Sequence, residues 1–465
     1  MFGKRLFPGG IHPLEGPNGK AVNGLNPIEE SLPPKRVFIP VSQHIGAPAK
    51  VIVKKGDLVK MGQKLAEAGG FVSAPVHASV SGEVEDIRPV LTFNGTEVEA
   101  VIIANDHKDE WVELHPPANP ESLTAQEMID IIREAGIVGM GGATFPTPVK
   151  LTIAPDKHFE KLIVNGAECE PYLTADHRLM VEHAPEIIDA LKLLMSAFQV
   201  PETIIGVEQN KPDAIEALRA AAADEPRITV KGLPVRYPQG GEKQLIYALT
   251  RRVVPAGALP IAAGCVVLNA GTVYAIDQAL REGKPLVQRV TTVGGLVNKP
   301  CNVLVRIGTP VRILLRTALG ALPEARTLIS GGPMMGTAFT DIAIPVTKGT
   351  SGILALGAEA IDPEESPCIR CGRCMRACPM KLQPVKMDHL IRARQFDEAD
   401  RVGVMNCIEC GACTFVCPAK RLLTQSFRAG KRIVTIRRNQ QKAREAAEQA
   451  AMAAREAAGN EKKEG

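Results

Sequence analysis

Alternation of apolar and polar residues predicts short strands in the first part of the chain. Between 37 and 103, apolar residues recur at about every second position and are interrupted by glycine and proline. Turns are expected at Lys55-Gly56-Asp57 and at Ser81-Gly82, because such residues close tight hairpins. The pattern therefore predicts an all-β domain, for which we take residues 1–115.

This first domain resembles the small β-sandwich barrel of biotinyl and lipoyl domains. Those domains carry a modified lysine on an exposed hairpin, whereas the corresponding turn here, Ala68-Gly69-Gly70-Phe71, has no lysine. We therefore expect a docking or scaffolding barrel rather than a carrier with a swinging arm.

After a proline-rich linker at 115–120, helical periodicity alternates with short apolar runs. Thr124 and Glu127 predict a capping box for a helix that ends at Gly136. The order that follows is strand 162–165, helices 175–181 and 186–198, strand 203–208, helix 212–222 and strand 228–230. This alternation predicts a doubly wound α/β domain with a mostly parallel sheet, placed at 121–285.

A second region of short strands runs from Val290 to about Leu356 and contains a predicted helix near 312–318. We interpret it as a ubiquitin-like β-grasp domain, residues 286–360. A cysteine-rich domain at 361–430 and an Ala/Glu/Arg helix at 431–465 complete the chain. Because that last helix has no broad apolar stripe, we expect a solvated or frayed tail.

Composition narrows the class of protein. The chain has 465 residues, of which 45% are hydrophobic, as in a soluble protein of several domains. It has no run of about 18 apolar residues that could cross a bilayer, and MFGKRLFPGG lacks the apolar core of a secretory signal. Its 11 cysteines favour a reducing compartment over a disulfide framework. Only 4% of residues are aromatic, so nucleic acid is not an expected partner.

Positive charge gathers toward the C-terminus. From Lys420 onward the chain has 12 Lys or Arg against 5 Asp or Glu, and Arg370, Arg373 and Arg376 lie in the cysteine-rich region. Such a surface could meet acidic electron carriers or anionic lipid headgroups. Local compensation of cluster charge and a solvated tail explain it equally well.

The cysteine-rich region contains two copies of one motif, CIRCGRCMRACP from Cys368 and CIECGACTFVCP from Cys407. This spacing is the one that holds two 4Fe–4S clusters in bacterial ferredoxins, where the fourth cysteine of each run binds the other cluster. The predicted ligands are Cys368, Cys371, Cys374 and Cys417 for one cluster, and Cys407, Cys410, Cys413 and Cys378 for the second. A pair of zinc sites is the alternative, but zinc ribbons use separated pairs of cysteines.

A glycine-rich stretch, GIVGMGGATFPTPVKL from Gly136, is the second chemical signal. Gly139, Gly141 and Gly142 let backbone N–H groups approach an anion or a flat ring, and Lys150 could meet a phosphate. It is neither a P-loop nor a dinucleotide fingerprint, since no Gly-Lys-Ser/Thr follows and it opens after a helix. A structural turn and a ligand site are equally consistent with the loop alone.

Two further segments bear on the same question. NGAECEP follows the strand at 162–164 at its carboxyl end, where open α/β sheets bind ligands. Glu168 and Glu170 there are either a solvated acid pair or hydrogen-bonding partners of ribose hydroxyls. YPQGGEK, from Tyr237, precedes a predicted helix and could close a pocket.

In this order, the glycine-rich loop, NGAECEP, YPQGGEK and LNAGT (268–272) resemble the FMN-binding elements of the NADH-oxidising flavoprotein subunit of respiratory complex I. The order of domains over essentially the whole chain resembles the RnfC family of the Rnf (Rsx) electron-transport complexes. The chain departs from the complex I pattern at four positions. Met140 replaces Arg, Thr144 replaces Gly, Ala167 replaces Asp and Gly241 replaces Glu.

The resemblance implies a set of cofactor-binding residues and no catalytic side chain. Residues implied to lie along FMN are Gly139, Gly141, Gly142 and Lys150; Asn165, Glu168 and Glu170 would face flavin and nicotinamide nucleotide, and Tyr237, Gly240, Glu242 and Asn269 would complete the pocket. The implied cofactors are FMN and two 4Fe–4S clusters, with NAD(H) as substrate.

The implied activity is electron transfer from NAD(H) through FMN to the clusters, in a complex that exchanges electrons between NADH and ferredoxin and moves ions. Such a subunit sits peripherally on the cytoplasmic face of the inner membrane, held by integral-membrane and iron–sulfur subunits, and a ferredoxin-like carrier is a further possible partner. Two alternatives stay open. One is a soluble flavoprotein of the cobalamin-reductase type, which usually lacks the leading barrel. The other is a flavin-free iron–sulfur relay.

Overall fold

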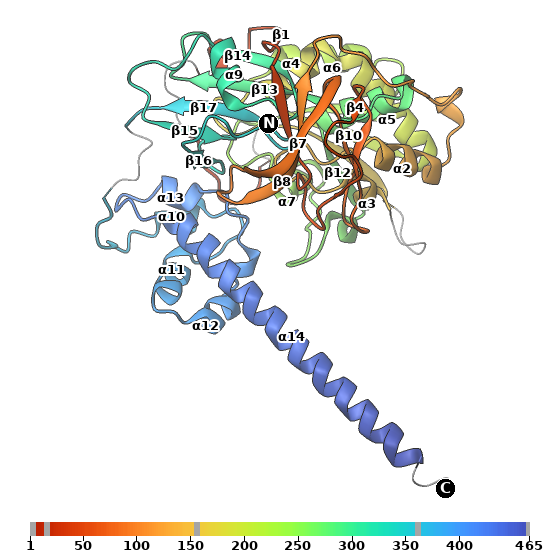
Figure 1. Cartoon of the computed structure of the whole chain (residues 1–465). Helices are drawn as coiled ribbons and strands as arrows, with labels where there is room; N and C mark the ends of the chain where they lie inside the picture. Colours follow the sequence, from red (N-terminus) through yellow and green to blue (C-terminus); the bar gives the residue numbers. More distant parts are fainter. Residues whose placement is uncertain (1–5, 14–18, 153–158, 359–363, 462–465) are drawn as a thin grey trace. The chain divides into compact units, whose positions relative to one another are not determined.

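The computed structural model describes residues 6–13, 19–152, 159–358 and 364–461, with side chains up to 450. The chain divides into two compact units, each treated by itself below (Figure 1). The first comprises Met1–Phe7 and Ile11–Pro363, and the second Pro8–Gly10 and Glu364–Gly465. Within the described residues, no helix is both long and apolar enough to cross a membrane.

The first unit begins with two small antiparallel sheets that pack around one apolar core. One sheet has the order β2 (Arg36–Pro40), β8 (Glu97–Asn105), β7 (Gly82–Leu91) and β4 (Leu58–Val59), and the other β3 (Lys50–Val51), β5 (Lys64–Glu67) and β6 (Val76–His77). Their shared core includes Val37, Leu65, Val84 and Ile103, all fully buried. The inward residues alternate with exposed ones, as the sequence pattern predicted.

The α/β domain contains a four-stranded sheet of order β11 (Ile228–Leu233), β10 (Glu202–Glu208), β9 (Lys161–Gly166) and β12 (Cys265–Asn269). All of its pairs are parallel. On β9, Leu162 and Val164 face one apolar core and Ile163 faces another, so the sheet is buried on both faces. This arrangement agrees with the predicted parallel sheet.

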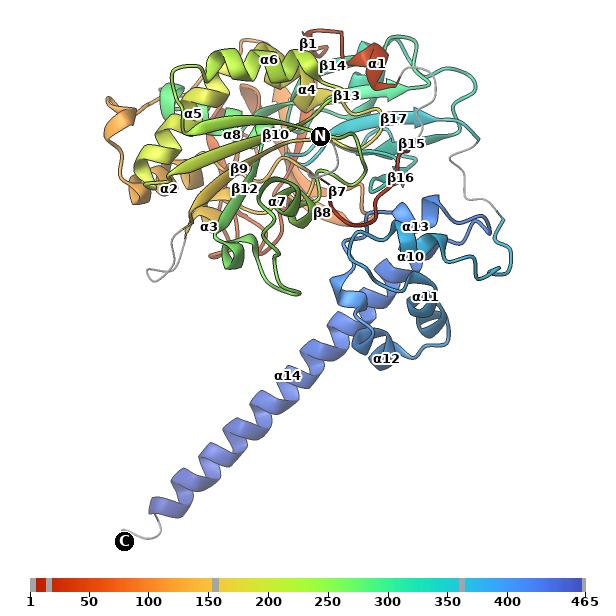
Figure 2. The same ribbon diagram turned by 180° about the vertical axis from the view of Figure 1, so that it is seen from behind.

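Helices cover both faces of this sheet (Figure 2). On one face pack α2 (Ala125–Glu134), α3 (Thr147–Leu151), α4 (Ala175–Glu182), α5 (Ala184–Ala197), α6 (Pro212–Ala221) and α8 (Ala270–Glu282), and on the other α7 (Glu242–Thr250). The predicted capping box is present at the start of α2, between Thr124 and Glu127. Short turns η1 (Pro120–Ser122) and η2 (Pro260–Ala263) flank the domain.

A mixed sheet of six strands forms the third part of the first unit. Its order is β1 (Ile28–Glu30), β14 (Cys301–Arg306), β13 (Gln288–Gly295), β17 (Gly352–Leu356), β15 (Thr327–Ser330) and β16 (Thr337–Phe339), and α9 (Val311–Thr317) packs on it. The edge strand β1, which follows the short helix α1 (Lys20–Asn23), pairs in parallel with β14. The range 1–115 predicted for the barrel therefore contains a strand of another sheet. Three residues, Ile-Glu-Glu, are too few to show an alternation that would have assigned them.

The second unit is helical. It contains α10 (Arg373–Ala377), α11 (Pro384–Arg392), α12 (Phe396–Arg401), η4 (Val404–Asn406), α13 (Ala412–Phe415) and the long helix α14 (Leu423–Glu461). Leu423, Phe427 and Val434 of α14 are buried in the core of this unit, whereas residues 435–450 are exposed. The helix thus continues through the boundary predicted at 430, and its solvated part begins a few residues later.

Lys348 joins three parts of the first unit from a buried position. Its ammonium donates to the carbonyls of Pro75, at 2.8 Å, and of Gly136, at 2.6 Å. Its backbone N–H donates to the Gln43 side chain at 2.9 Å. Burial lowers the pKa of Lys348 to about 7. A neutral amine still has two N–H groups, which match the two carbonyls.

This lowered pKa makes stability depend on pH in one direction. Above about pH 7 the folded chain releases the Lys348 proton, whereas the unfolded chain keeps it up to the ordinary value of 10.5. The unfolded state then binds more protons, so the free energy of unfolding rises with pH between these two values.

We expect the stability difference between the wild type and Lys348→Met to move in favour of the wild type between about pH 7 and about pH 9.5. Urea unfolding of both proteins at the two pH values measures this difference. Lys54→Met, at an exposed lysine, is the control and should show no such change. A wild-type advantage over Lys348→Met that stays constant across this range would contradict the role given to Lys348.

Candidate functional site

The glycine-rich loop is closed at its base and open at its tip. Gly139 N–H donates to the Phe145 carbonyl at 2.8 Å, and Thr144 N–H donates to the Gly139 carbonyl at 3.1 Å. Gly142 has a φ of +100°, and a Cβ at that position would meet no atom within 4 Å. Residues 141–143 are exposed. The loop therefore presents backbone, without side-chain bulk, at a fixed place.

Four segments that are far apart in the sequence meet at the carboxyl edge of the parallel sheet. Asn165 ends β9, and its amide donates to the Gly240 carbonyl at 2.9 Å. Asn269 ends β12, and its Cβ would lie 3.5 Å from a Cβ built on Gly141. The predicted site residues from the loop, NGAECEP, YPQGGEK and LNAGT are thus brought together, at the edge where open α/β sheets bind ligands.

Asn269 has a definite structural role as the N-cap of α8. Its side-chain oxygen accepts from the N–H groups of Gly271 and Thr272, at 2.9 and 3.3 Å. Its amide donates to Asp176 at 2.6 Å. Thr272 in turn accepts from the N–H of Met140 at 2.9 Å, so the cap and the glycine-rich loop are held together.

Lys150 lies half-buried at the start of α7. Its ammonium donates to Glu242 at 2.8 Å and to the Val267 carbonyl at 2.9 Å. A cation beside the N-terminus of a helix and next to a glycine loop suits the phosphate of a nucleotide or flavin.

The two glutamates of NGAECEP do different things. Glu168 has a φ of +44°, and its carboxylate accepts from the N–H groups of Asp176, at 2.8 Å, and His177, at 3.1 Å, at the start of α4. Glu170 accepts from the Tyr237 hydroxyl at 3.3 Å and from the Met334 N–H at 3.0 Å. Burial raises the pKa of Glu170 to about 7. Glu168 therefore caps a helix, and Glu170 joins three segments around the site.

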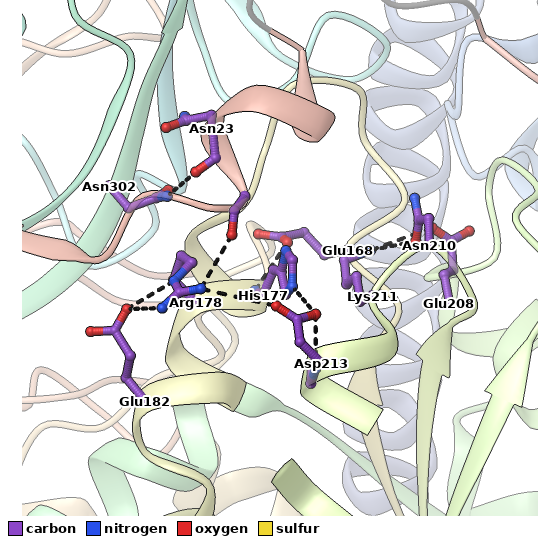
Figure 3. Close-up of polar contacts among 12 residues, drawn as sticks. Asn23, Glu168, His177, Arg178, Glu182, Glu208, Asn210, Lys211, Asp213 and Asn302 are labelled. Atoms are coloured by element: carbon purple, nitrogen blue, oxygen red, sulfur yellow. Dashed lines mark hydrogen bonds and ion pairs between the residues drawn. The ribbon is translucent and has the colours of Figure 1, made fainter. Parts of the chain in front are cut away.

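Two lysines that the sequence did not single out hold the backbone of this segment. Lys211, 1% exposed, donates to the Ala167 carbonyl at 2.8 Å and lies 3.6 Å from the buried carboxylate of Glu208 (Figure 3). Lys20 of α1 donates to the next carbonyl, that of Glu168. Burial lowers the pKa of Lys211. Nothing in a lysine's sequence context marks it as buried, and Lys20 is 148 positions from its acceptor.

Figure 3 also shows ion pairs next to this segment, between His177 and Asp213 at 2.7 Å and between Arg178 and Glu182 at 2.8 Å. They tie α4 to α6 and, through Arg178 and the Gly24 carbonyl, to the end of α1.

In the second unit, four cysteines line one cavity. Cys378, Cys407, Cys410 and Cys413 surround it together with apolar side chains such as Met387 and Phe427. Burial, with neighbouring thiols, raises the pKa of both Cys410 and Cys413 to about 12, and Cys378 contributes to both shifts. The fourth cysteine of the first run thus lies with the second run. A lined cavity with four soft sulfur donors fits an iron–sulfur cluster.

The first run has a corresponding partner in the second. Burial raises the pKa of Cys374, and the charge of Cys417 adds to that shift, so these two thiols lie close together. Cys368 and Cys371 of the same run are exposed.

Four family models match successive parts of the chain. Residues 5–108 match the RnfC barrel sandwich hybrid domain, 132–278 the Nuo51 FMN-binding domain, 290–338 the SLBB domain and 360–418 the 4Fe-4S dicluster domain. The matches fall in the predicted order of barrel, flavin-type domain, third sheet and cluster region.

Curated relatives match over most of the chain, and each is the RnfC subunit of its complex. That of the proton-translocating ferredoxin:NAD(+) oxidoreductase complex of Clostridium ljungdahlii is 49% identical over 91% of this chain and 93% of its own length. That of the Na(+)-translocating complex of Acetobacterium woodii is 46% identical over 93% and 98%. That of the ion-translocating oxidoreductase complex of Vibrio cholerae is 40% identical over 85% of this chain and 51% of its own length. At these identities and this coverage, the chain belongs to the RnfC family of the ion-translocating ferredoxin:NAD(+) oxidoreductase complexes.

Proposed function

We propose that this chain carries electrons between NAD(H) and two 4Fe–4S clusters by way of FMN, as a subunit of a complex that couples electron exchange between NADH and ferredoxin to ion translocation. The observation that carries the proposal is the meeting of the glycine-rich loop, Asn165, Gly240 and Asn269 at one edge of the parallel sheet. A chain built only to relay electrons between clusters would have no use for such an edge.

The flavin pocket is assigned to the residues around that edge. Gly139, Gly141 and Gly142 give the ring access to the backbone, and Lys150 at the start of α7 receives the phosphate. Asn165, Glu168, Glu170, Tyr237, Gly240, Glu242 and Asn269 form the rest of the pocket. FMN supplies the exchange between two-electron hydride transfer and one-electron carriers. The chain's residues bind and orient the reactants, and Glu170, with its pKa of about 7, can hold or release a proton at its carboxylate near neutral pH.

The clusters are assigned to two sets of thiols, and each set borrows one cysteine from the other run. Cys378 completes the set of Cys407, Cys410 and Cys413, a proposal that the shared cavity supports. Cys417 completes the set of Cys368, Cys371 and Cys374.

The finer assignments of fold and place follow from the same family. The first domain is taken as a biotinyl/lipoyl-like barrel without a carrier lysine, and the mixed sheet as a β-grasp domain. The chain would sit on the cytoplasmic face of the inner membrane, bound to integral-membrane and iron–sulfur subunits.

Purification under anaerobic conditions, followed by flavin and iron analysis, tests the proposal. About one FMN and about eight irons per chain are expected, for one flavin and two clusters. Iron without flavin would favour the flavin-free relay. Co-purification with membrane subunits distinguishes the complex from a soluble cobalamin-reductase-type flavoprotein, which would purify alone.

Lys150→Ala should lose bound FMN and keep both clusters, because it removes the cation assigned to the phosphate. Flavin fluorescence after denaturation and the cluster absorbance measure the two cofactors separately. Lys243→Ala is the control, since Lys243 donates to the Pro255 carbonyl and should retain flavin. Full flavin occupancy in Lys150→Ala would show that the phosphate is placed wrongly.

Cys378→Ala should damage the cluster of the second run, and Cys417→Ala that of the first. Each variant is expected to keep about four irons and one of the two cluster signals in electron paramagnetic resonance. The two variants serve as controls for each other. If each loses the cluster of its own run instead, the exchange of the fourth cysteine does not occur.

A further inference from the structure

The two cysteine runs have the same backbone, residue for residue, 39 positions apart. Arg370 and its counterpart Glu409 have φ of +56° and +57°, and the N–H of each donates to the first sulfur of its run at 3.4 Å. Gly372 and Gly411 have φ of +70° and +77° and begin the short helices α10 and α13. Differences between the runs therefore lie in their side chains and in what covers them.

The second run is covered by α14. Glu409 forms ion pairs with Lys431 and Arg428 of that helix, the latter at 3.4 Å. Lys431 also donates to the Cys407 carbonyl at 2.9 Å, and the Thr414 hydroxyl accepts from the Thr424 N–H at 3.0 Å. Ala412, the counterpart of Arg373, is fully buried. The cluster assigned to this run is enclosed.

The first run has no such cover in the described part of the chain. Arg370, Arg373 and Arg376 are all exposed, and none has a carboxylate within 4.0 Å among the described residues. Ile369 and Met375 are 67% and 45% exposed. Each of these five residues lies within two positions of a cysteine assigned to the first cluster.

One more apolar side chain belongs with them. Phe415, two positions before Cys417, is 50% exposed on α13, and α13 packs against α10. We call the six residues the arginine face: Ile369, Arg370, Arg373, Met375, Arg376 and Phe415.

We propose that the arginine face docks a redox protein with an acidic surface, and that one electron at a time passes between that partner and the cluster held by Cys368, Cys371, Cys374 and Cys417. The step transfers no atoms, because either the cluster is reduced as the partner is oxidised or the reverse. The inference rests on the proposed function in so far as this cluster must be redox-active.

The side chains favour a protein over a membrane. Arginine, methionine and aromatic residues are enriched at protein interfaces, and arginine binds carboxylates with two parallel hydrogen bonds. The face contains three arginines and no lysine. Anionic membranes are typically bound by clusters of four to eight basic residues. Three exposed guanidinium groups around apolar side chains therefore fit a carboxylate-bearing partner.

The test uses the holoprotein with intact clusters and a small acidic two-cluster ferredoxin, chemically reduced, as probe. Stopped-flow absorbance gives the second-order rate of cluster reduction as a function of salt. The variant is the triple Arg370→Glu, Arg373→Glu, Arg376→Glu. The charge-matched control is Arg432→Glu, Lys442→Glu, Arg444→Glu, at exposed positions of α14.

We expect the wild-type rate to fall steeply with salt, because opposite charges steer the encounter. At low salt the triple variant should be slower by about tenfold or more, with a flatter salt dependence, and the control should stay within about twofold. Equal losses in both variants, or no loss in the triple variant, would overturn the proposal. So would binding of the wild type, but not of the triple variant, to phosphatidylglycerol vesicles without any change in the ferredoxin rate.

Iron content and the cluster signal are measured in every variant. If the triple variant loses its first cluster, Arg373→Glu alone takes its place, and a rate equal to wild type would then overturn the proposal. The probe reduces the cluster directly and needs no flavin, so failure of docking and failure of the flavin assignment give different results.

Discussion

Main-chain carbonyls held by buried or half-buried cations are the interaction on which the candidate flavin site depends. Lys211 and Lys20 bind the successive carbonyls of Ala167 and Glu168, and Lys150 binds that of Val267. Lys348 binds the Gly136 carbonyl at the start of the glycine-rich loop. Such charge-assisted bonds are stronger than neutral ones, and a buried cation left without acceptors would be costly.

This arrangement has a geometric effect on the loops. In a trans peptide the N–H points away from the C=O. When the carbonyls of Ala167 and Glu168 are turned toward lysines, the N–H groups of the following residues are turned away from them. The cations therefore do more than stabilise the loops, since they decide which side of the backbone bears donors. A site for an anionic, acceptor-rich cofactor needs donors.

The sequence predicted those features that local pattern controls. The strands and helices from 161 to 233, the capping box at Thr124 and the meeting of Asn165 with the glycine-rich loop all follow from periodicity and from the position of strand ends. What it could not predict depends on distant partners. Lys20 and β1 act through contacts with segments far along the chain. Glu168 and Glu170 look alike in sequence, yet one caps α4 and the other contacts Tyr237 and Met334. In the cysteine region the spacing predicted the ligands, but only the packing of α14 distinguishes an enclosed run from an exposed one.

The parallel pairing of β1 with β14 has a consequence for the order of folding. Residues 20–30 leave the ribosome early, but Glu168 and Asn302, which Lys20 and Ile28 contact, are made much later. Contacts of such long range in sequence form slowly and late. The N-terminal segment is therefore the last piece of the first unit to settle, after the parallel sheet and the mixed sheet exist. Until then the Glu168 carbonyl lacks its lysine, and the candidate flavin pocket is open on that side while cofactors are inserted.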